Sequence, residues 1–137
     1  MKDTQRAIEE CSSRYERCYR ELPVMLHSID GDGHIIDVNA EWLRTLGYEH
    51  AEVIGRPAVD FLTEESRRYV LEETLPAFFR TGYARDVPYS FVTKDGDVVE
   101  VLLSATTERD QHGKFLRSIS VAVKTADMEA TRGETVS

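Results

Sequence analysis

Acidic and histidine side chains near residue 30 are the first candidates for chemistry in this sequence. Asp30-Gly31-Asp32-Gly33-His34 resembles the start of a calcium-binding loop, with Glu41 at the twelfth position. Such a loop needs glycine at its sixth position for a sharp turn, and that position is Ile35 here. A hairpin turn held by Asp30 is the better interpretation, because Asp and Gly favour tight turns between strands. We therefore predict no metal site.

Other acid–base and nucleophilic side chains form no catalytic constellation. Glu64-Glu65 and Glu72-Glu73 lie on one predicted helix, where adjacent side chains point apart and share no site. The sequence has no Gly-x-Ser-x-Gly elbow, phosphate-binding loop or zinc-spaced Cys/His cluster. The four histidines are expected at the surface, namely His27, His34, His50 and His112. We predict no catalytic residues and no enzymatic activity.

Composition indicates a single globular domain, since the 137 residues are 41% hydrophobic and 31% charged. The net charge of −8 repels nucleic-acid phosphates and anionic lipid. No apolar run approaches the ~20 residues of a membrane span, and the N-terminus lacks the apolar core of a signal peptide. Two cysteines cannot build a disulfide framework. We expect a cytoplasmic domain without a nucleic-acid or membrane partner.

Residues 1–22 are predicted to contain an amphipathic helix that ends at Pro23. Its apolar positions alternate in steps of three and four, the spacing of a coiled-coil seam, namely Ile8, Cys11, Tyr15, Cys18 and Leu22. This stripe either lies on its own domain or pairs with a second copy. The two cysteines lie about 10.5 Å apart along a helix, too far for a bond within one chain. In a parallel dimer each cysteine would meet its own copy, so an oxidant could cross-link the chains.

The rest of the chain alternates between strand-like and helical patterns. Strands are predicted at residues 24–29, 34–38, 84–93, 98–107 and 115–124. Asn39 is expected to cap a short helix at 40–46, and a longer helix at 63–81 is expected to kink at Pro76. Gly55 lies in an irregular connection. Short turns make the last three strands antiparallel neighbours, and Pro88 places one of them at a sheet edge. The predicted fold class is α+β, with one antiparallel sheet.

This order of elements, together with several short motifs, resembles the PAS domain, or sensory box, over about residues 22–123. The motifs are, in chain order, Pro23-Val24-Met25, Asp30-Gly31-Asp32-Gly33, Val38-Asn39-Ala40-Glu41-Trp42, Leu46-Gly47-Tyr48, Glu52-Val53-Ile54-Gly55-Arg56-Pro57, Gly82, Lys94-Asp95-Gly96 and Arg109-Asp110-Gln111-His112-Gly113. The resemblance implies a five-stranded antiparallel sheet in the order 2-1-5-4-3, with helices on one face. It also implies a PAS domain at residues 23–124, preceded by the helix at 1–22 and followed by a polar tail or linker at 125–137.

PAS domains are sensor and interaction modules, so the resemblance places either a ligand or a packed core between sheet and helices. The candidate lining residues are Trp42, Phe61, Leu62, Tyr69, Leu75, Tyr89, Phe91, Val101, Leu103, Ser118 and Ser120. This mostly apolar set suits a small apolar ligand and equally a core packed shut, the usual role of apolar stripes. On the other side of the sheet lies an apolar surface on which a helix could pack, formed by Ile119, Val121 and Val123.

The resemblance also tests particular cofactors. A flavin light sensor of the LOV type needs a cysteine just after position 56, where this chain has Pro57-Ala58. In those light sensors, side-chain amides form hydrogen bonds with the polar edge of the flavin. The positions of this chain that would align with them have no amide, namely Phe91, Val101 and Ala122. Haem-binding members take a histidine from the long helix, and residues 63–81 contain no histidine. We predict no cofactor.

The predicted function is that of a sensory signal-transduction module, which binds a small apolar ligand or dimerises and relays a change to an output domain or partner protein. Related domains sit beside histidine kinases of two-component systems, diguanylate cyclases and transcription regulators. One alternative is a structural homodimerisation module with a filled core. Another is a small α+β enzyme of the isomerase or dehydratase type. The enzyme would need an ionisable pair facing the interior, and Phe91, Val101 and Leu103 offer none.

Overall fold

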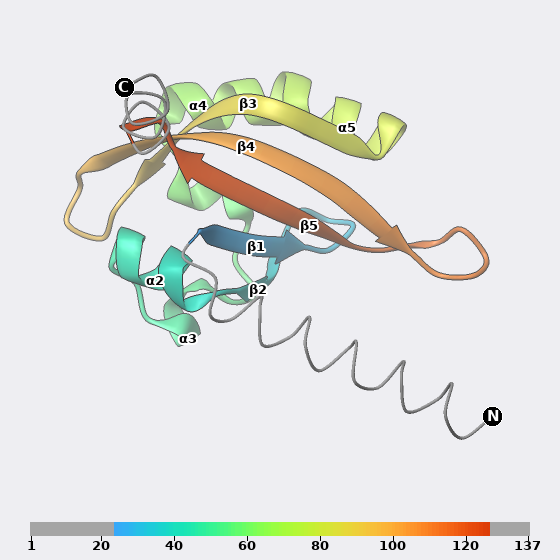
Figure 1. The fold of residues 1–137 in the computed structure, drawn as a ribbon, viewed down its shortest axis with the longest axis horizontal. Coiled ribbons are helices and arrows are strands. Elements are labelled where there is room, and N and C mark those ends of the chain that lie inside the picture. Colours follow the sequence, from blue (N-terminus) through green and yellow to red (C-terminus); the bar gives the residue numbers. More distant parts are fainter. Residues whose placement is uncertain (1–23, 127–137) are drawn as a thin grey trace, which may run out of the picture.

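The computed structural model describes residues 24–126. The predicted dimer helix at residues 1–22 and nearly all of the tail at 125–137 lie outside the described residues. Between these limits the chain folds into one antiparallel sheet with helices on one of its faces (Figure 1).

Five strands form the sheet in the order β2-β1-β5-β4-β3, and all neighbours are antiparallel. Their bounds are Met25–Ile29 (β1), Ile35–Val38 (β2), Tyr83–Val92 (β3), Val98–Arg109 (β4) and Phe115–Lys124 (β5). The predicted α+β class and strand order are both confirmed. Pro88 lies on β3, an edge strand, where a residue without an N–H is tolerated.

Two turns of the same aspartate-based design join β1 to β2 and β4 to β5. In the first turn, one carboxylate oxygen of Asp30 accepts hydrogen bonds from the N–H groups of Asp32 at 2.9 Å and His34 at 3.0 Å. Asp110 accepts the equivalent pair in the second turn, at 2.8 and 2.9 Å. The third residue after each aspartate is a glycine with φ of 84° or 83°, a conformation that costs other residues free energy. The structural role predicted for Asp30 is confirmed.

Asn39 ties the short helix α2 (Ala40–Leu46) to the sheet. Its side-chain oxygen accepts a hydrogen bond from the N–H of Trp42 at 3.0 Å, which caps the helix. The same oxygen accepts from the N–H of Leu26 on β1 at 3.0 Å, and the side-chain nitrogen donates to the Val24 carbonyl at 2.7 Å. Asn39 therefore performs the predicted capping role and also fixes α2 against β1.

The connection predicted to be irregular contains two short helical segments, α3 (His50–Val53) and η1 (Ala58–Phe61). Gly55 lies between them with φ of 89°, which explains why a glycine is needed there. Its N–H donates to the carbonyl of Ile35 on β2 at 2.8 Å. Gly55 thus anchors this connection to the edge of the sheet, as its expected structural role requires.

The long helix predicted at residues 63–81 is continuous but changes its geometry halfway. Its three parts are α4 (Glu64–Tyr69), η2 (Val70–Thr74) and α5 (Leu75–Thr81). The middle part is a π-helical turn, in which the N–H of Leu75 donates to the carbonyl of Val70. Pro76 follows in the first turn of α5 and cannot donate a backbone hydrogen bond. The kink expected at Pro76 stays a prediction, and the irregularity in the structure is the π-helical turn just before it.

The helices divide one face of the sheet between them. In Figure 1, α4 and α5 run behind β3 and β4, whereas α2 lies beside β1. The hydrophobic core lies between this inner face and the helices. Among the described residues, no helix has both the length and the apolar character that a membrane crossing requires.

Candidate functional site

The inner face of the sheet carries the predicted pocket residues of the last three strands. All six are buried, namely Tyr89, Phe91, Val101, Leu103, Ser118 and Ser120. They alternate with exposed or half-buried neighbours along each strand, as side chains on one face of a pleated sheet must. The sequence-based assignment of these residues to one shared face is correct.

Most of the residues predicted on the helix side also face the interior. Trp42, Phe61 and Leu62 are buried, and Leu75 is half-buried. Tyr69 is the exception, because 53% of its surface is exposed and it does not line the interior. The predicted place of Tyr69 in the pocket is wrong.

The long helix turns a different set of side chains toward the sheet. Val70, Thr74 and Phe78 are its buried residues, and they are four positions apart. Side chains four positions apart lie on one face of a helix. A π-helical turn contains more residues than an α-helical turn, so it favours alignment of side chains at this spacing. This spacing is present in the sequence, yet Val70, Thr74 and Phe78 are absent from the predicted pocket residues.

Aromatic rings fill the part of the interior next to α2. The Trp42 and Phe61 ring centroids are 5.5 Å apart in an edge-to-face arrangement, and those of Trp42 and Phe91 are 6.0 Å apart. Tyr48 closes the cluster against Phe61 at 5.0 Å. These rings pack on one another and leave no space between them for a ligand.

A small cavity remains on the other side of the interior, between the sheet and the η2–α5 part of the long helix. Its volume is about 30 Å³, room for one or two water molecules and far less than the ~150 Å³ that admits benzene in an engineered cavity. Five of the predicted residues line this cavity, namely Leu62, Leu75, Tyr89, Leu103 and Ser120. The others named for the pocket belong to the packed core, apart from the exposed Tyr69.

His27 on β1 also lines the cavity, which overturns its predicted place at the surface. Its side chain is only 5% exposed, because β1 is covered by a strand on each side and faces the helices. Its Nδ1 atom is buried and has no hydrogen-bond partner among the described residues. Burial lowers the pKa of His27 from 6.5 to about 4, so the imidazole is neutral at pH 7. Met25 and Ile29, which lie two positions on either side of His27, are the sequence signal that could have placed it on the inner face.

Two more polar side chains border the cavity. Ser120 Oγ lies 3.2 Å from Ser118 Oγ, and Ser118 Oγ accepts a hydrogen bond from the N–H of Ile29 at 3.0 Å. Tyr89 is a largely buried residue, and burial raises the pKa of its hydroxyl above the ordinary value of 10.0. His27 and Tyr89 are thus two titratable groups lining one cavity, so the prediction of no ionisable pair facing the interior is wrong.

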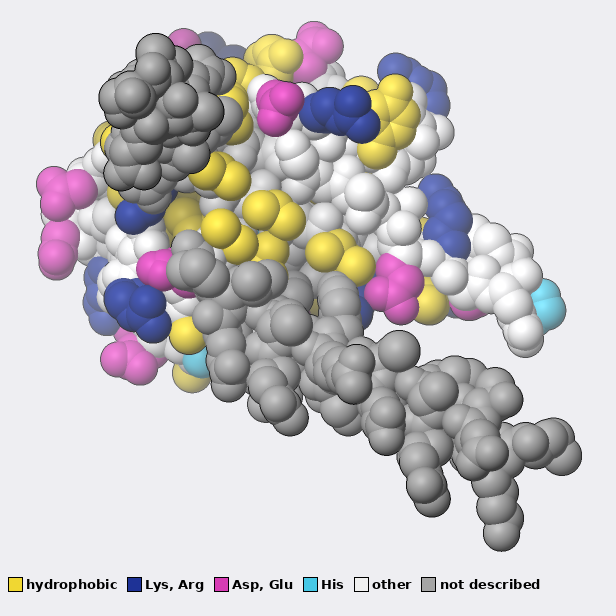
Figure 2. Space-filling view, in the orientation of Figure 1, with side chains coloured by type: hydrophobic (Ala, Val, Ile, Leu, Met, Phe, Trp, Pro, Cys, Tyr) yellow, Lys and Arg dark blue, Asp and Glu magenta, His cyan; other side chains and the backbone are white. Residues whose placement is uncertain are grey.

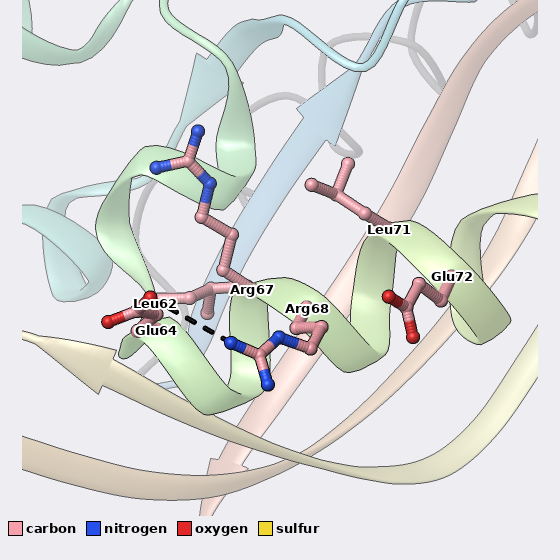
Figure 3. Close-up of a pocket in the computed structure, with 6 residues that line it drawn as sticks. All are labelled: Leu62, Glu64, Arg67, Arg68, Leu71 and Glu72. Atoms are coloured by element: carbon pink, nitrogen blue, oxygen red, sulfur yellow. Dashed lines mark ion pairs between the residues drawn. The ribbon is translucent and has the colours of Figure 1, made fainter.

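A larger groove lies on the outer side of the long helix and is a surface feature (Figure 3). It has a volume of about 460 Å³ and is bordered by Leu62, Arg67 and Leu71. Glu64 and Arg68 form an ion pair there, with N and O atoms 3.9 Å apart and both side chains mostly exposed. Exposed pairs of this kind contribute little to stability or binding, so we do not assign a site to this groove.

The turn after β1 brings three possible metal ligands together. Ligand atoms of Asp30, Asp32 and His34 lie within 4.8 Å of one another. The Asp30 oxygen already accepts two backbone hydrogen bonds, which accounts for this aspartate without an ion. The absence of a metal site stays a prediction.

The strand order, with helices closing one face of an antiparallel sheet around a small cavity, defines the architecture of PAS sensory domains. The family model described as PAS domain matches residues 22–123. The chain therefore belongs to the PAS domain family. No curated protein matches the sequence.

Solved structures with similar folds include two PAS domains and a light receptor. The PAS domain of an HTR-like protein from Haloarcula marismortui is 26% identical, with a TM-score of 0.70, and the match covers 90% of this chain and 99% of that one. A PAS domain from Colwellia psychrerythraea is 15% identical with a TM-score of 0.75, covering 83% and 96% of the two chains. An RNA-binding light-oxygen-voltage receptor is 16% identical with a TM-score of 0.68, covering 82% of this chain and 32% of that one. The last two likenesses concern the fold alone.

Proposed function

We propose that this PAS domain is a non-enzymatic sensory module that admits a small, largely apolar ligand to the cavity beside His27 and relays the change to an output domain or partner protein. The observation that carries the proposal is the small cavity between the sheet and the long helix, lined by His27, whose buried Nδ1 atom has no partner among the described residues. A buried polar atom without a partner costs about 1–3 kcal/mol, and a ligand that supplies the partner recovers part of that cost.

We propose that the described conformation is the closed form of this site. A cavity of about 30 Å³ must enlarge before it takes more than water. The π-helical turn η2 lies at the cavity wall, because Val70 and Leu75 at its two ends are lining residues. Single π-helical turns within α-helices are rare and are frequent at functional sites. We assign the opening movement to this part of the helix.

The titratable pair in the cavity supports a sensor rather than an enzyme. Burial lowers the pKa of His27 to about 4 and raises that of Tyr89, so neither group exchanges a proton readily at pH 7. A general acid or base works best with a pKa near the working pH. This pair therefore suits neutral hydrogen bonding to a ligand.

The proposed ligand is a small molecule and no bound flavin or haem. The inner-face positions that align with flavin-reading amides hold buried carbon-only side chains, namely Phe91, Val101 and Ala122. Pro57-Ala58 takes the place of the photoactive cysteine, and the long helix at 63–81 has no histidine to bind haem iron. A visible absorption spectrum of the purified protein tests this, and an absorbing cofactor would overturn it.

The ligand site itself is tested by native mass spectrometry of protein purified from cells, compared with its denatured mass. We expect a reproducible bound small molecule that is lost in Leu103→Trp, because that indole fills the cavity. Leu102→Trp is the matched control, since the next residue of β4 points to the opposite face and is half-buried there. If the native and denatured masses are identical and the protein gains no ligand from a cell extract, the proposed ligand site is contradicted. The domain would then be a structural module with a filled core.

Homodimerisation is a second proposed activity, favoured by the outer face of the sheet. Figure 2 shows hydrophobic side chains gathered over the strands on this face. By strand alternation the outward residues include Leu102, Ile119, Val121 and Val123, all half-buried. We expect a dimer by light scattering that becomes a monomer in Val121→Glu, with Leu116→Glu at an exposed position as the charge-matched control. A monomeric full chain that also fails to cross-link under mild oxidation would contradict both this dimer and the predicted pairing through the helix at 1–22.

The remaining functional proposals follow from charge. A net charge of −8 gives no general attraction for nucleic acid or anionic membranes, so we propose protein partners in the cytoplasm.

A further inference from the structure

The cavity beside His27 is lined mostly by apolar side chains, and its polar groups, His27, Tyr89 and Ser120, all come from the sheet. His27 on β1 and Ser120 on β5 are paired residues of neighbouring antiparallel strands, so their side chains stand next to each other on the inner face. The opposite wall comes from the long helix, with Val70, Leu75 and Phe78. A molecule in this cavity therefore meets hydrogen-bonding groups on the sheet side alone, whereas the helix side offers only hydrocarbon.

Charge narrows the class of molecule further. Among the described residues, no Asp, Glu, Lys or Arg lines the cavity. A charged ligand enclosed there would lose its hydration without gaining an opposite charge, which costs far more free energy than one hydrogen bond returns. The ligand must be neutral when bound.

The state of His27 narrows the class once more. A neutral imidazole has one N–H donor and one bare nitrogen acceptor, and either nitrogen can carry the proton. The Nδ1 atom, without a partner among the described residues, can therefore serve as donor or as acceptor. A hydroxyl both donates and accepts, so it completes the pairing of His27 in either tautomer. The ligand hydroxyl can form its second hydrogen bond with the hydroxyl of Ser120. That hydroxyl lies 3.2 Å from the hydroxyl of Ser118.

Resting on the proposed ligand-sensing function, we propose that the cavity selects a neutral molecule with a hydroxyl group, a small alcohol or phenol, whose hydroxyl pairs with His27 and Ser120 while its apolar body lies against Leu75 and Phe78.

The test uses the full chain and three aromatic probes of similar size, phenol, benzene and benzoate, at pH 7. Binding is followed by NMR of the ¹⁵N-labelled imidazoles, where His34, half-buried in the turn after β1, serves as an internal control. We expect phenol to shift the His27 nitrogen resonances saturably and to bind about tenfold more tightly than benzene, the value of one net hydrogen bond. Benzoate should not bind, and the His34 resonances should not move.

Two variants separate recognition by His27 from entry into the cavity. His27→Leu should bind benzene as before and bind phenol about tenfold more weakly than the wild type, which removes the preference. Leu75→Ala enlarges the cavity on its helix side and leaves the polar groups of the sheet intact, so it should bind both neutral probes more tightly and keep the preference for phenol. If the wild-type cavity is too small for an aromatic ring, the affinities for phenol and benzene can still be compared in this variant.

The outcomes distinguish this inference from the function on which it rests. Equal affinity for phenol and benzene, or an unchanged preference in His27→Leu, would overturn the role of His27 while leaving a ligand site. Absence of saturable binding of every probe to both the wild type and Leu75→Ala would overturn the ligand site itself.

Discussion

His27 on β1 and Ser120 on β5 are paired across two antiparallel strands, and both side chains border the same internal cavity. This pairing places a nitrogen without a hydrogen-bond partner among the described residues beside a hydroxyl that is part of a buried serine pair. The polar groups of the cavity, including Tyr89 of the edge strand β3, therefore all come from strands of the sheet, whereas the long helix contributes only apolar groups.

Replacing His27 by leucine should stabilise the protein in the absence of ligand. The variant removes a buried polar atom that has no partner and replaces it with hydrocarbon of similar size. We expect the free energy of unfolding at pH 7, measured with urea, to rise by about 1 kcal/mol. A loss of more than about 1 kcal/mol would show that the imidazole is already satisfied in the ligand-free protein.

The stability of the wild type should fall between pH 6.5 and pH 4 because of His27. Its pKa is 6.5 in the unfolded chain and about 4 in the folded protein, so the unfolded state binds more protons throughout this window. The free energy of unfolding therefore decreases as the pH falls, by about 3 kcal/mol once the pH is below the folded pKa. Urea titrations at several pH values measure the slope.

Carboxylates also titrate in that window, so the variants provide the comparison. His27→Leu should lose the part of the slope that lies between pH 6.5 and 4, whereas His112→Leu, at an exposed turn position, should keep the wild-type slope. Parallel pH profiles for the wild type and His27→Leu would contradict the burial of a neutral imidazole.

Asn39→Ala should be among the most damaging polar substitutions in the domain. It removes the cap of α2 and leaves the N–H of Leu26 on β1 without its side-chain acceptor. We expect a loss of about 2–3 kcal/mol in the free energy of unfolding, the sum of a cap and a buried hydrogen bond. Thr63→Ala, which removes only the cap of α4, should cost about 1 kcal/mol. Equal costs for the two variants would show that Asn39 acts as a cap alone.

The long helix offers a direct test of which face meets the sheet. Phe78→Ala should lower the free energy of unfolding by about 3–5 kcal/mol, because the ring is 3% exposed and lines the cavity. Tyr69→Ala should change it by less than about 0.5 kcal/mol, because that side chain is 53% exposed. A reversed order would mean that the helix is rotated in solution.

Local chemistry explains what could be predicted from the sequence. Asp30 and Asn39 act on residues two to four positions away, so the turn and the cap were visible in short stretches of sequence. Strand alternation likewise placed Tyr89 and Leu103 on the inner face correctly. The strand order, however, came from the resemblance to the PAS family and not from these local patterns.

The errors have tertiary causes. Histidine is more often half-exposed than buried, and His27 is buried only because strands flank β1 on both sides and helices cover it. Tyr69 was misplaced because the phase of the long helix depends on the π turn that follows it. The size of the cavity depends on how side chains from seven separate strands and helical segments meet, which no local spacing determines.

In the π turn of η2, a backbone hydrogen bond joins residues five positions apart, whereas an α-helical bond joins residues four positions apart. The segment Val70–Thr74 therefore contains one residue more than an α-helical turn needs. Deleting Glu72, an exposed side chain in that turn, should yield an uninterrupted α-helix whose two flanks keep their present partners. Domains of this family that differ by a single residue in length at this point should therefore share one topology. They should differ in the stiffness of the long helix that covers the inner face of the sheet.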